Sequence, residues 1–499
     1  MDKKVLSEEF YGHLTKDIIP FWAGLKDDEN GGFFGLVDFD HRRDEMADKG
    51  CILNSRILWF FSSAYLLFDE LEEKKDANGQ DSAVEDENVR KPEKTAEYRH
   101  LKAICMEQAR HAYTFLTEHF EDKENGGVFW SVTYDGKPSD TLKHTYCHAF
   151  AIYALAAYFD ASGDRKAFDK AMELADLIEE RCTDEVGYLE AFNRDFTPAP
   201  NDELSENGVM ADKTMNTLLH VFEAYTELLR VIKKRFPAVV RAESLQMKDS
   251  AGTASNTGEC STKDNRTGLD DGSGSIGISA PVNGARSGYS RENVEMATKI
   301  ANRMRFILDI FSEKIYNTKL RRQEVFFDKD YNSMIDLHSY GHDIETSWLL
   351  DRGLEVLTDV GYTNEIEPLT LSLAERIYER AYSGHSLLNE CEKGVDDKRR
   401  VWWVQAETVI GFVHASEKIL RKKDRVTMTM KASGLSAKDR QETVIEAERR
   451  SASFFIASVD VWEFIKEKMI DRRTVNESTE GSASAAEDSD QEHIPAEWY

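Results

Sequence analysis

Apolar residues recur at three- and four-residue intervals along most of this chain, which is the spacing of one face of a helix. Between Lys213 and Ile232 the apolar positions are Met215, Leu218, Leu219, Phe222, Tyr225, Leu229 and Ile232. The same pattern predicts helices at residues 6–25, 55–71, 99–120, 142–161, 167–182, 213–232, 292–315, 344–357, 369–382, 404–420 and 453–470. Strand-like segments are few and short, so the chain is predicted to be all-α.

Short glycine-rich or aromatic segments recur between pairs of these helices. Asn30–Gly35 resembles Asn125–Trp130, and weaker relatives occur at Gly187–Leu189, Val325–Phe327, Ser386–Leu388 and Glu497–Tyr499. A unit of one hairpin and two helices buries its apolar faces only against its neighbours, so such units form stacked or closed arrays. Six units predict a toroid, an (α/α)6 barrel with short β-hairpins. Because the sixth hairpin begins at Trp498 and the sequence stops at Tyr499, the barrel is expected to lack its final helix.

Four polar stretches interrupt the helical pattern, at residues 72–98, 242–290, 421–451 and 473–492. The second is the clearest, because residues 242–288 contain no Phe, Trp or Tyr while Gly and Ser recur. Such a segment cannot bury enough apolar area to offset the entropy lost on ordering. We therefore predict exposed or disordered insertions in a single barrel domain spanning residues 1–499. The alternative is that one of them is a regulatory or partner-binding segment.

The net charge of −28 narrows the class of partner. An acidic surface repels phosphate backbones and anionic lipids, so we expect no nucleic acid and no membrane partner. The longest near-apolar run, residues 57–68, falls short of the ~20 residues that cross a bilayer, and the N-terminus lacks the pattern of a secretory signal. No CxxC occurs among Cys51, Cys105, Cys147, Cys182, Cys260 and Cys391. We expect free thiols, a cytoplasmic location and a monomer.

One motif has the residues for acid–base chemistry. In His338–Glu345, the spacing allows His338, His342 and Glu345 to lie on one helical face, where a carboxylate can orient an imidazole. An equally weighted alternative is that these are helix-end histidines bonded to the backbone. Zinc binding is a weaker interpretation, because the glutamate lies outside an HExxH frame and no third ligand is evident. We expect no metal.

Polar residues also interrupt two otherwise apolar helices. Asn216 and His220 form a polar stripe beside Leu218, Leu219 and Phe222, and buried polar groups need partners. Arg56 lies in the first turn of an apolar helix, and Tyr146 offers a hydroxyl in a similar place. In a helical toroid such groups can meet a polar ligand in the central cavity. A lone core histidine is an equally common interpretation of His220.

The segment Arg400–Glu407 places two indoles beside polar groups. Trp402 and Trp403 are adjacent, and Glu407 follows Trp403 by one turn. Flat rings suit the apolar faces of a sugar, while carboxylates and amides suit its hydroxyls. The alternative is that the aromatic residues belong to the core. No nucleotide-binding or serine-hydrolase motif occurs in a suitable context, so no cofactor is expected.

Taken together, these motifs resemble one family. The matching segments are Ala47–Gly50, Asn54–Phe61, Gly136–Tyr146, Leu204–Gly208, Ala211–Asn216, His338–Glu345 and Arg400–Glu407. As a set they are similar to the cellobiose 2-epimerases of the N-acylglucosamine 2-epimerase superfamily. The version Trp-Trp-Val-Gln-Ala-Glu favours the disaccharide enzymes over those that act on N-acylglucosamine.

The resemblance implies an activity and a set of site residues. Members of this family interconvert the reducing-end glucose of β-1,4-linked disaccharides, such as cellobiose and lactose, with mannose at C2. A histidine removes the C2 proton, a cis-enediolate forms, and a proton returns to the opposite face. By this resemblance the catalytic residues are His342, His220, Arg56 and Glu345. The substrate-binding residues are Tyr146, Asn216, Trp402, Trp403 and Glu407.

The resemblance also exposes a departure from the family pattern. Family members continue beyond the hairpin at Glu497–Tyr499 into a segment with a second acid/base histidine and a closing helix. A protein that ended at Tyr499 is therefore expected to epimerise poorly, whereas a longer parent would be active. Three alternatives stay open: an aldose–ketose isomerase or N-acylglucosamine 2-epimerase on the same fold, a non-catalytic sugar-binding protein, and an inverting glycosidase.

Overall fold

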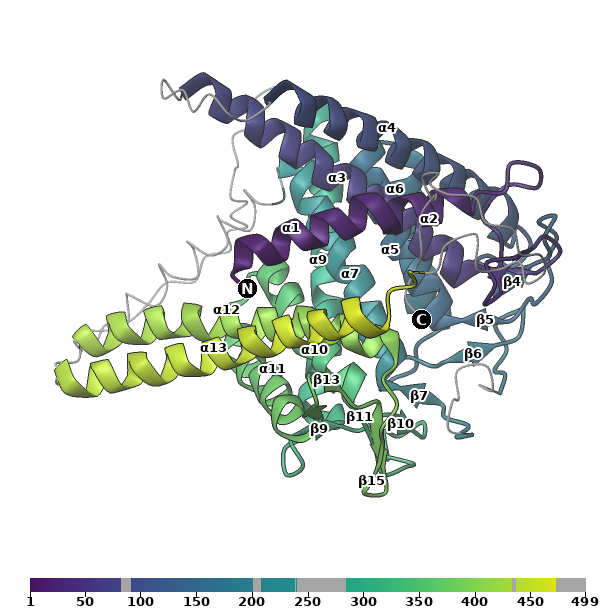
Figure 1. Ribbon diagram of the computed structural model, residues 1–499. Coiled ribbons are helices and arrows are strands. Elements are labelled where there is room, and N and C mark those ends of the chain that lie inside the picture. Colours follow the sequence, from purple (N-terminus) through teal and green to yellow (C-terminus); the bar gives the residue numbers. More distant parts are fainter. Residues whose placement is uncertain (82–90, 201–207, 238, 240–283, 433–436, 473–499) are drawn as a thin grey trace, which may run out of the picture.

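The computed structural model describes residues 1–81, 91–200, 208–237, 239, 284–432 and 437–472, and it is mostly helical (Figure 1). Every segment predicted to be helical forms a helix. The helices are α1 (Lys3–His13), α2 (Ile19–Gly24), α3 (Cys51–Asp81), α4 (Lys91–Phe115), α5 (Thr145–Ser162), α6 (Arg165–Arg181), α7 (Met215–Arg235), α9 (Gly284–Ile310), α10 (Tyr340–Leu357), α11 (Val360–Arg380), α12 (Trp402–Ala432) and α13 (Ala437–Lys468). Single π-helical turns, Leu14–Ile18, Leu116–Phe120 and Phe311–Ile315, follow α1, α4 and α9.

The helices form an inner and an outer layer. Along the inner layer, α3 packs on α5, α5 on α7, α7 on α10 and α10 on α12, while α4, α6, α9, α11 and α13 cover them from outside. Nearly every residue of inner helix α5 is buried, whereas outer helix α6 buries one stripe that includes Phe168, Leu174 and Ile178. A helix buried on all sides lies inside, and an amphipathic one lies at the surface. This is the alternating arrangement of an (α/α)6 barrel, as the repeat predicts.

The N-terminal helix joins the two edges of the outer layer. Phe10 of α1 packs edge-on against Trp462 of α13, with ring centroids 4.8 Å apart. On its other side, Tyr11 meets Phe68 of α3 and Tyr98 of α4. Among the residues that the structure describes, no inner helix lies between α12 and α3. The sixth hairpin, expected at Trp498, lies outside the described residues.

Short strands hold the beginnings of four of the five described inner helices. The strands β3 (Lys49–Gly50), β5 (Lys143–His144), β7 (Lys213–Thr214) and β11 (Leu337–Ser339) immediately precede α3, α5, α7 and α10. Each pairs antiparallel with a strand further along the chain: β4 (Ser131–Val132), β6 (Ala191–Phe192), β10 (Phe326–Phe327) and β14 (Glu390–Glu392), respectively. Figure 1 shows these strands gathered along one side of the molecule. The N-termini of the inner helices therefore lie at one end of the barrel.

Further short strands complete the hairpins. The pairs are β1 (Leu36–Val37) with β2 (Arg43–Asp44), β8 (Tyr316–Asn317) with β9 (Arg322–Gln323), and β12 (Tyr382–Ser383) with β13 (Ser386–Leu387), and β15 (Val395–Asp397) adds to β14. The two Asn-Gly-Gly segments seen in the sequence are equivalent turns, because Gly31, Gly32, Gly126 and Gly127 all have positive φ. A Cβ on Gly127 would also lie 2.2 Å from Nε2 of His148. Only glycine fits there.

Buried ion pairs fasten the hairpin loops to the inner helices. The residue two positions before α3, α5 and α7 is a buried lysine, and it pairs with the aspartate that opens a hairpin loop: Lys49 Nζ with Asp27 Oδ2 at 2.7 Å, Lys143 Nζ with Asp122 Oδ2 at 3.1 Å, and Lys213 Nζ with Asp184 Oδ2 at 2.5 Å. Removing one member would leave its partner charged and buried. These pairs therefore hold the helix starts in place.

Asp122→Ala tests this fastening. Asp122 is buried, pairs with Lys143 and accepts two hydrogen bonds of 2.9 Å from Arg194. We expect urea unfolding at pH 7 to show a loss of about 3–5 kcal/mol, because a buried lysine loses its partner. The exposed Asp169→Ala is the control, and its effect should stay within about 0.5 kcal/mol. An equal effect of both variants would contradict the assignment.

The same pair predicts a pH dependence of stability. Burial would raise the pKa of Asp122, but its hydrogen bonds with Arg194 and Lys143 outweigh burial and lower it. The stabilisation is therefore present above the unfolded carboxyl pKa of about 3.9, and it is lost as the pH falls towards the lower folded value. The difference between the wild type and Asp122→Ala should shrink below about pH 4.

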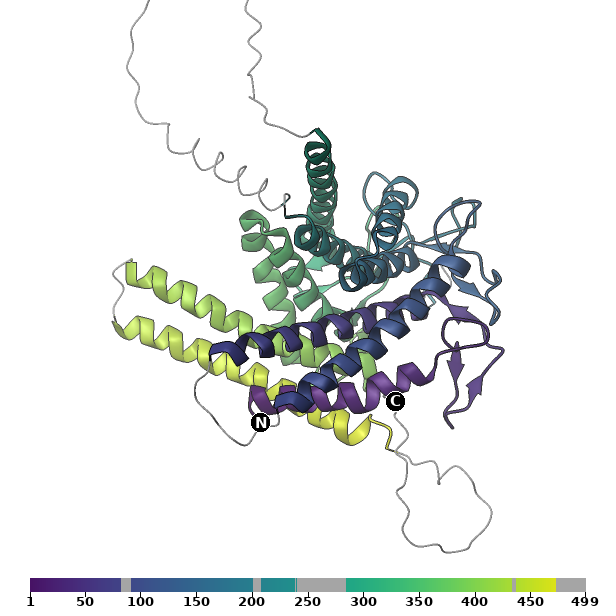
Figure 2. The ribbon, with the colours of Figure 1, turned by 90° about the horizontal axis from the view of Figure 1, so that it is seen from above.

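Two of the four predicted insertions are largely helical. Helix α3 continues to Asp81 and α4 begins at Lys91, so much of 72–98 is helical. Helices α12 and α13 likewise cover most of 421–451, and they extend together beyond the rest of the molecule (Figures 1 and 2). Helices that pack on one neighbour need only a narrow apolar stripe, so charge density alone is a poor sign of a loop. Helix α9 begins at Gly284, and residues 240–283 and 473–499 lie outside the described residues.

One inner helix has the length of a membrane span. In the described part of the chain, Cys51–Lys74 of α3 is long and apolar enough to cross a bilayer by length and composition. This window is longer than the run at 57–68 noted in the sequence. In the barrel, α3 packs against α4 and α5, and Leu58, Phe61 and Phe68 are fully buried.

Candidate active site

Equivalent positions of the inner helices form one layer of side chains. The sixth residues of α3, α5, α7, α10 and α12 are Arg56, Phe150, His220, Glu345 and Glu407. All except Phe150 line one cavity. Phe150 packs against two of them: its ring centroid lies 4.3 Å from the guanidinium carbon of Arg56 and 4.8 Å from the ring centroid of His220. The strand pairs fix the starts of α3, α5, α7 and α10 at the same level, so equal positions converge.

The structure brings all nine predicted site residues to this cavity, whose volume is about 660 Å³. The lining includes Arg56, Tyr146, Asn216, His220, His342, Glu345, Trp402, Trp403 and Glu407. Ligand sites in proteins typically enclose about 300–1,000 Å³, which fits a disaccharide. Trp402 is 44% exposed, whereas Trp403 is partly buried against His342. Their roles stay predictions.

His220 is oriented by a carboxylate on its own helix. Glu223 Oε2 lies 2.8 Å from His220 Nδ1, and Glu345 Oε1 lies 3.9 Å from Nε2. Burial lowers the pKa of His220, and the Glu223 carboxylate opposes that shift. The ring can therefore donate Nδ1–H to Glu223 and present Nε2 to the cavity.

His342 is held from two sides. Its Nδ1 lies 2.7 Å from Ser339 Oγ, and its ring centroid is 4.9 Å from that of Trp403. Burial, with a smaller contribution from His220, lowers the pKa of His342 to about 3. The imidazole is therefore neutral near pH 7 and can accept a proton.

Three carboxyl groups converge near one guanidinium. Burial raises the pKa of Glu345 well above its usual value, and the nearby Glu407 and Glu223 raise it further. Burial also raises the pKa of Glu407 to about 7, although Trp348 Nε1 donates a hydrogen bond of 2.8 Å to its Oε2. Burial and the two neighbouring carboxylates therefore favour the protonated form of Glu345.

Arg56 is the cation of this group. Burial disfavours its charge, but Tyr146, Glu223 and Glu345 outweigh burial and raise the pKa of Arg56. Burial raises the pKa of Tyr146, so this phenol stays protonated and can donate a hydrogen bond. The cavity thus combines a fixed positive charge and a hydroxyl donor with two imidazoles.

His338 does not share the cavity with His342, which corrects the expectation that both lie on one helical face. It belongs to β11, before the helix begins at Tyr340, so helical spacing does not apply to it. His338 Nε2 pairs instead with Asp343 Oδ2 at 2.7 Å. His338 takes the place that a lysine has before α3, α5 and α7, and it is a structural residue.

Sequence reasoning missed three supporting residues. Glu223, Ser339 and Trp348 each contact one member of the predicted set: His220, His342 and Glu407, respectively. The spacing from His220 to Glu223 was visible, but it did not distinguish Glu223 from Ala224. The contacts of Ser339 and Trp348 depend on strand geometry and on packing between helices, for which the sequence carries no local signal.

Asn216 marks a place for a ligand. Its Oδ1 is buried and has no protein partner among the residues that the structure describes. A buried carbonyl oxygen without a partner costs about 1–3 kcal/mol. Because Asn216 lines the cavity, a ligand hydroxyl can supply the missing hydrogen bond.

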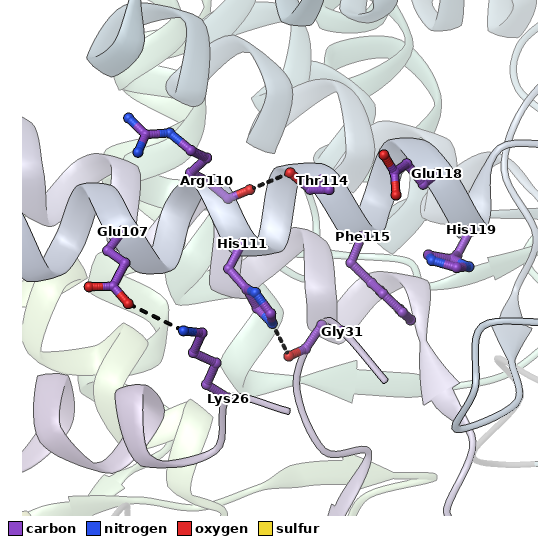
Figure 3. A pocket seen from close by; sticks show the side chains of 10 residues that line it. Lys26, Gly31, Glu107, Arg110, His111, Thr114, Phe115, Glu118 and His119 are labelled. Carbon is purple, nitrogen blue, oxygen red and sulfur yellow. Dashed lines mark hydrogen bonds and ion pairs between the residues drawn. The ribbon is translucent and has the colours of Figure 1, made fainter. Parts of the chain in front are cut away.

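A second hollow of about 330 Å³ lies between α4 and the loop that follows α2 (Figure 3). Some of its polar side chains are engaged within the protein: Lys26 Nζ donates to Glu107 at 3.2 Å, and His111 Nε2 lies 2.8 Å from the Gly32 carbonyl oxygen. None of the predicted site residues lies there. Across the described ranges, no three His, Cys, Asp or Glu side chains gather as a metal site requires.

Comparison with known proteins places the chain in a family. The family model for N-acylglucosamine 2-epimerase matches residues 95–224. Cellobiose 2-epimerase of Eubacterium cellulosolvens is 40% identical over 412 residues, 83% of this chain and 82% of that protein. The enzyme of Ruminococcus albus is 35% identical over 94% of this chain and 88% of its own length. The solved cellobiose 2-epimerase of Bacillus thermoamylovorans is 33% identical, with a TM-score of 0.63 over 95% of this chain and 90% of that one. The chain therefore belongs to the cellobiose 2-epimerase family of carbohydrate epimerases.

Proposed function

We propose that this protein is a disaccharide 2-epimerase that interconverts the reducing-end glucose of cellobiose or lactose with mannose, and that the chain forms one catalytic domain. One observation carries the proposal: His342, neutral at physiological pH, lines the same cavity as Arg56 and the paired indoles. A base, a fixed cation and a sugar-binding surface are the parts that C2 epimerisation needs. Family membership supports the same activity.

The cavity has distinct regions for binding. Trp402, the more exposed indole, suits stacking on the apolar face of a sugar ring. Asn216 Oδ1, which lacks a protein partner in the described part of the chain, suits a sugar hydroxyl deeper in the cavity. A disaccharide bound across both would place its reducing end next to His342 and Arg56.

The chemistry begins once the sugar ring is open. His220, whose Nδ1 is held by Glu223, is suited to move the proton that opens the ring. His342 Nε2 then takes the proton from C2, the C2–H electrons form the C1–C2 double bond, and negative charge develops on O1. Arg56 and the Tyr146 hydroxyl stabilise that charge. Inversion requires the proton to return to the opposite face, from a second donor or after the intermediate turns.

Deuterium exchange tests the proposal. Cellobiose incubated with the protein in deuterated water should yield an epimer labelled at C2, read by nuclear magnetic resonance. Label at C1 of a keto sugar would identify an aldose–ketose isomerase instead. Release of free glucose would identify a glycosidase. Calorimetric binding of cellobiose without any label would identify a sugar-binding protein.

A further inference from the structure

Ser339 departs from the usual behaviour of a serine at the start of a helix. It is the N-cap residue of α10, where a serine hydroxyl normally accepts a hydrogen bond from a backbone N–H of the first turn. Its side chain makes no such bond. Thr214, the N-cap of the neighbouring inner helix α7, does cap, because its side chain accepts from Thr217 N. The hydroxyl of Ser339 is thus available for another contact.

That contact is the side chain of His342. Ser339 Oγ lies 2.7 Å from His342 Nδ1, and Ser339 is buried. The backbone of Ser339 is fixed by β11, which pairs Ser339 with Glu390 of β14. The Trp403 ring also packs against the imidazole, with ring centroids 4.9 Å apart. The imidazole therefore has little freedom to turn.

We infer that Ser339 is a positioning residue that holds His342 in the tautomer with Nδ1 protonated, which leaves Nε2 open to the cavity as a base. Nδ1–H donates to Ser339 Oγ, so the lone pair resides on Nε2. When Nε2 takes the C2 proton, the resulting imidazolium keeps the Nδ1–H to Oγ hydrogen bond. The catalytic part of this inference depends on the proposed function, whereas the tautomer does not.

The tautomer can be measured without any substrate. In the ¹⁵N nuclear magnetic resonance spectrum of protein labelled with ¹⁵N-histidine, protonated and unprotonated ring nitrogens have well-separated chemical shifts. The signals of His342 are identified as those that are absent from the spectrum of His342→Gln. We expect a protonated Nδ1 in the wild type and in Ser339→Thr, which keeps the hydroxyl. Ser339→Ala should shift the population towards a protonated Nε2. A wild type with Nε2 protonated, or no change in Ser339→Ala, would overturn the inference.

Kinetics then separate positioning from stability. Ser339→Ala should lower the rate of C2 exchange about ten- to a hundredfold, the usual cost of losing an orienting partner. It should leave KM within about threefold, because the lost interaction does not touch the sugar. Because Ser339 forms no cap bond, Ser339→Ala should lower the melting temperature of the protein less than Asp164→Ala, which removes a true cap from α6. Asp164→Ala should keep the full rate of C2 exchange.

Each outcome has one meaning. Equal exchange rates in Ser339→Ala and the wild type would overturn the positioning role. If the wild type showed the expected tautomer but no deuterium exchange at C2, the proposed function would be contradicted and the tautomer assignment would remain valid. Rescue of exchange in Ser339→Thr, with its hydroxyl restored, would support positioning over a loss of folding.

Discussion

Replacing His342 by alanine should abolish measurable deuterium exchange at C2 of cellobiose, with a loss of about a hundredfold to ten-thousandfold. We propose the imidazole as the base of the cavity, and burial lowers its pKa to about 3, which keeps it unprotonated near pH 7. Binding of the disaccharide should weaken by no more than about tenfold, or ~1.4 kcal/mol, because the other lining residues remain. Calorimetry measures the binding, and nuclear magnetic resonance measures the exchange.

The same motif supplies a matched control. His338 pairs with Asp343 away from the cavity, at the position that holds a lysine before three other inner helices. His338→Lys places at this position the residue type that pairs with an aspartate before three other inner helices, so this variant should fold and retain exchange. If His338→Lys lost exchange while His342→Ala kept it, the assignment of the two histidines would be reversed.

The helices of this protein could be predicted from sequence because the apolar spacing is a local signal. Inner helix α7 shows the full pattern from Met215 to Ile232, and the apolar residues that form this pattern are buried. The polar stretches are a weaker signal, because charge density does not distinguish an exposed helix from a loop. The residues of α12 and α13 beyond the barrel are charged, yet they continue as two helices that lie against each other. That partnership depends on residues far apart in the chain.

The site residues were predicted from the family resemblance, and four of the nine also follow the repeat. Lys49, Lys143, Lys213, His338 and Arg400 each precede an inner helix by two residues, and the side chains of the layer described above follow at one fixed offset. Aligning the units on this basic residue distinguishes His338 from His342 by sequence position alone. The same alignment cannot find Trp348, whose hydrogen bond to Glu407 joins two different inner helices.

Replacing Arg56 by methionine should lower the rate of C2 exchange by about a hundred- to a thousandfold, the usual cost of losing one oxyanion partner. Methionine keeps much of the apolar stem but removes the charge that we propose stabilises O1 in the intermediate. Arg56→Lys keeps a positive charge but loses the planar guanidinium group. Its exchange rate should therefore lie between the rates of the wild type and of Arg56→Met. Exchange at the wild-type rate in Arg56→Met would exclude Arg56 from the chemistry.

The same substitution should change the titration of the neighbouring carboxyl groups, which gives a readout independent of turnover. Arg56 now lowers the pKa of both Glu345 and Glu407, whereas burial raises it. Without the guanidinium, burial is less opposed, so the midpoint of Glu407 should move above its present value of about 7. Infrared difference spectra of the carboxyl band would follow that titration, with Glu407→Gln to assign the signal. A midpoint that stayed the same or fell would show that the guanidinium does not act on this carboxyl group.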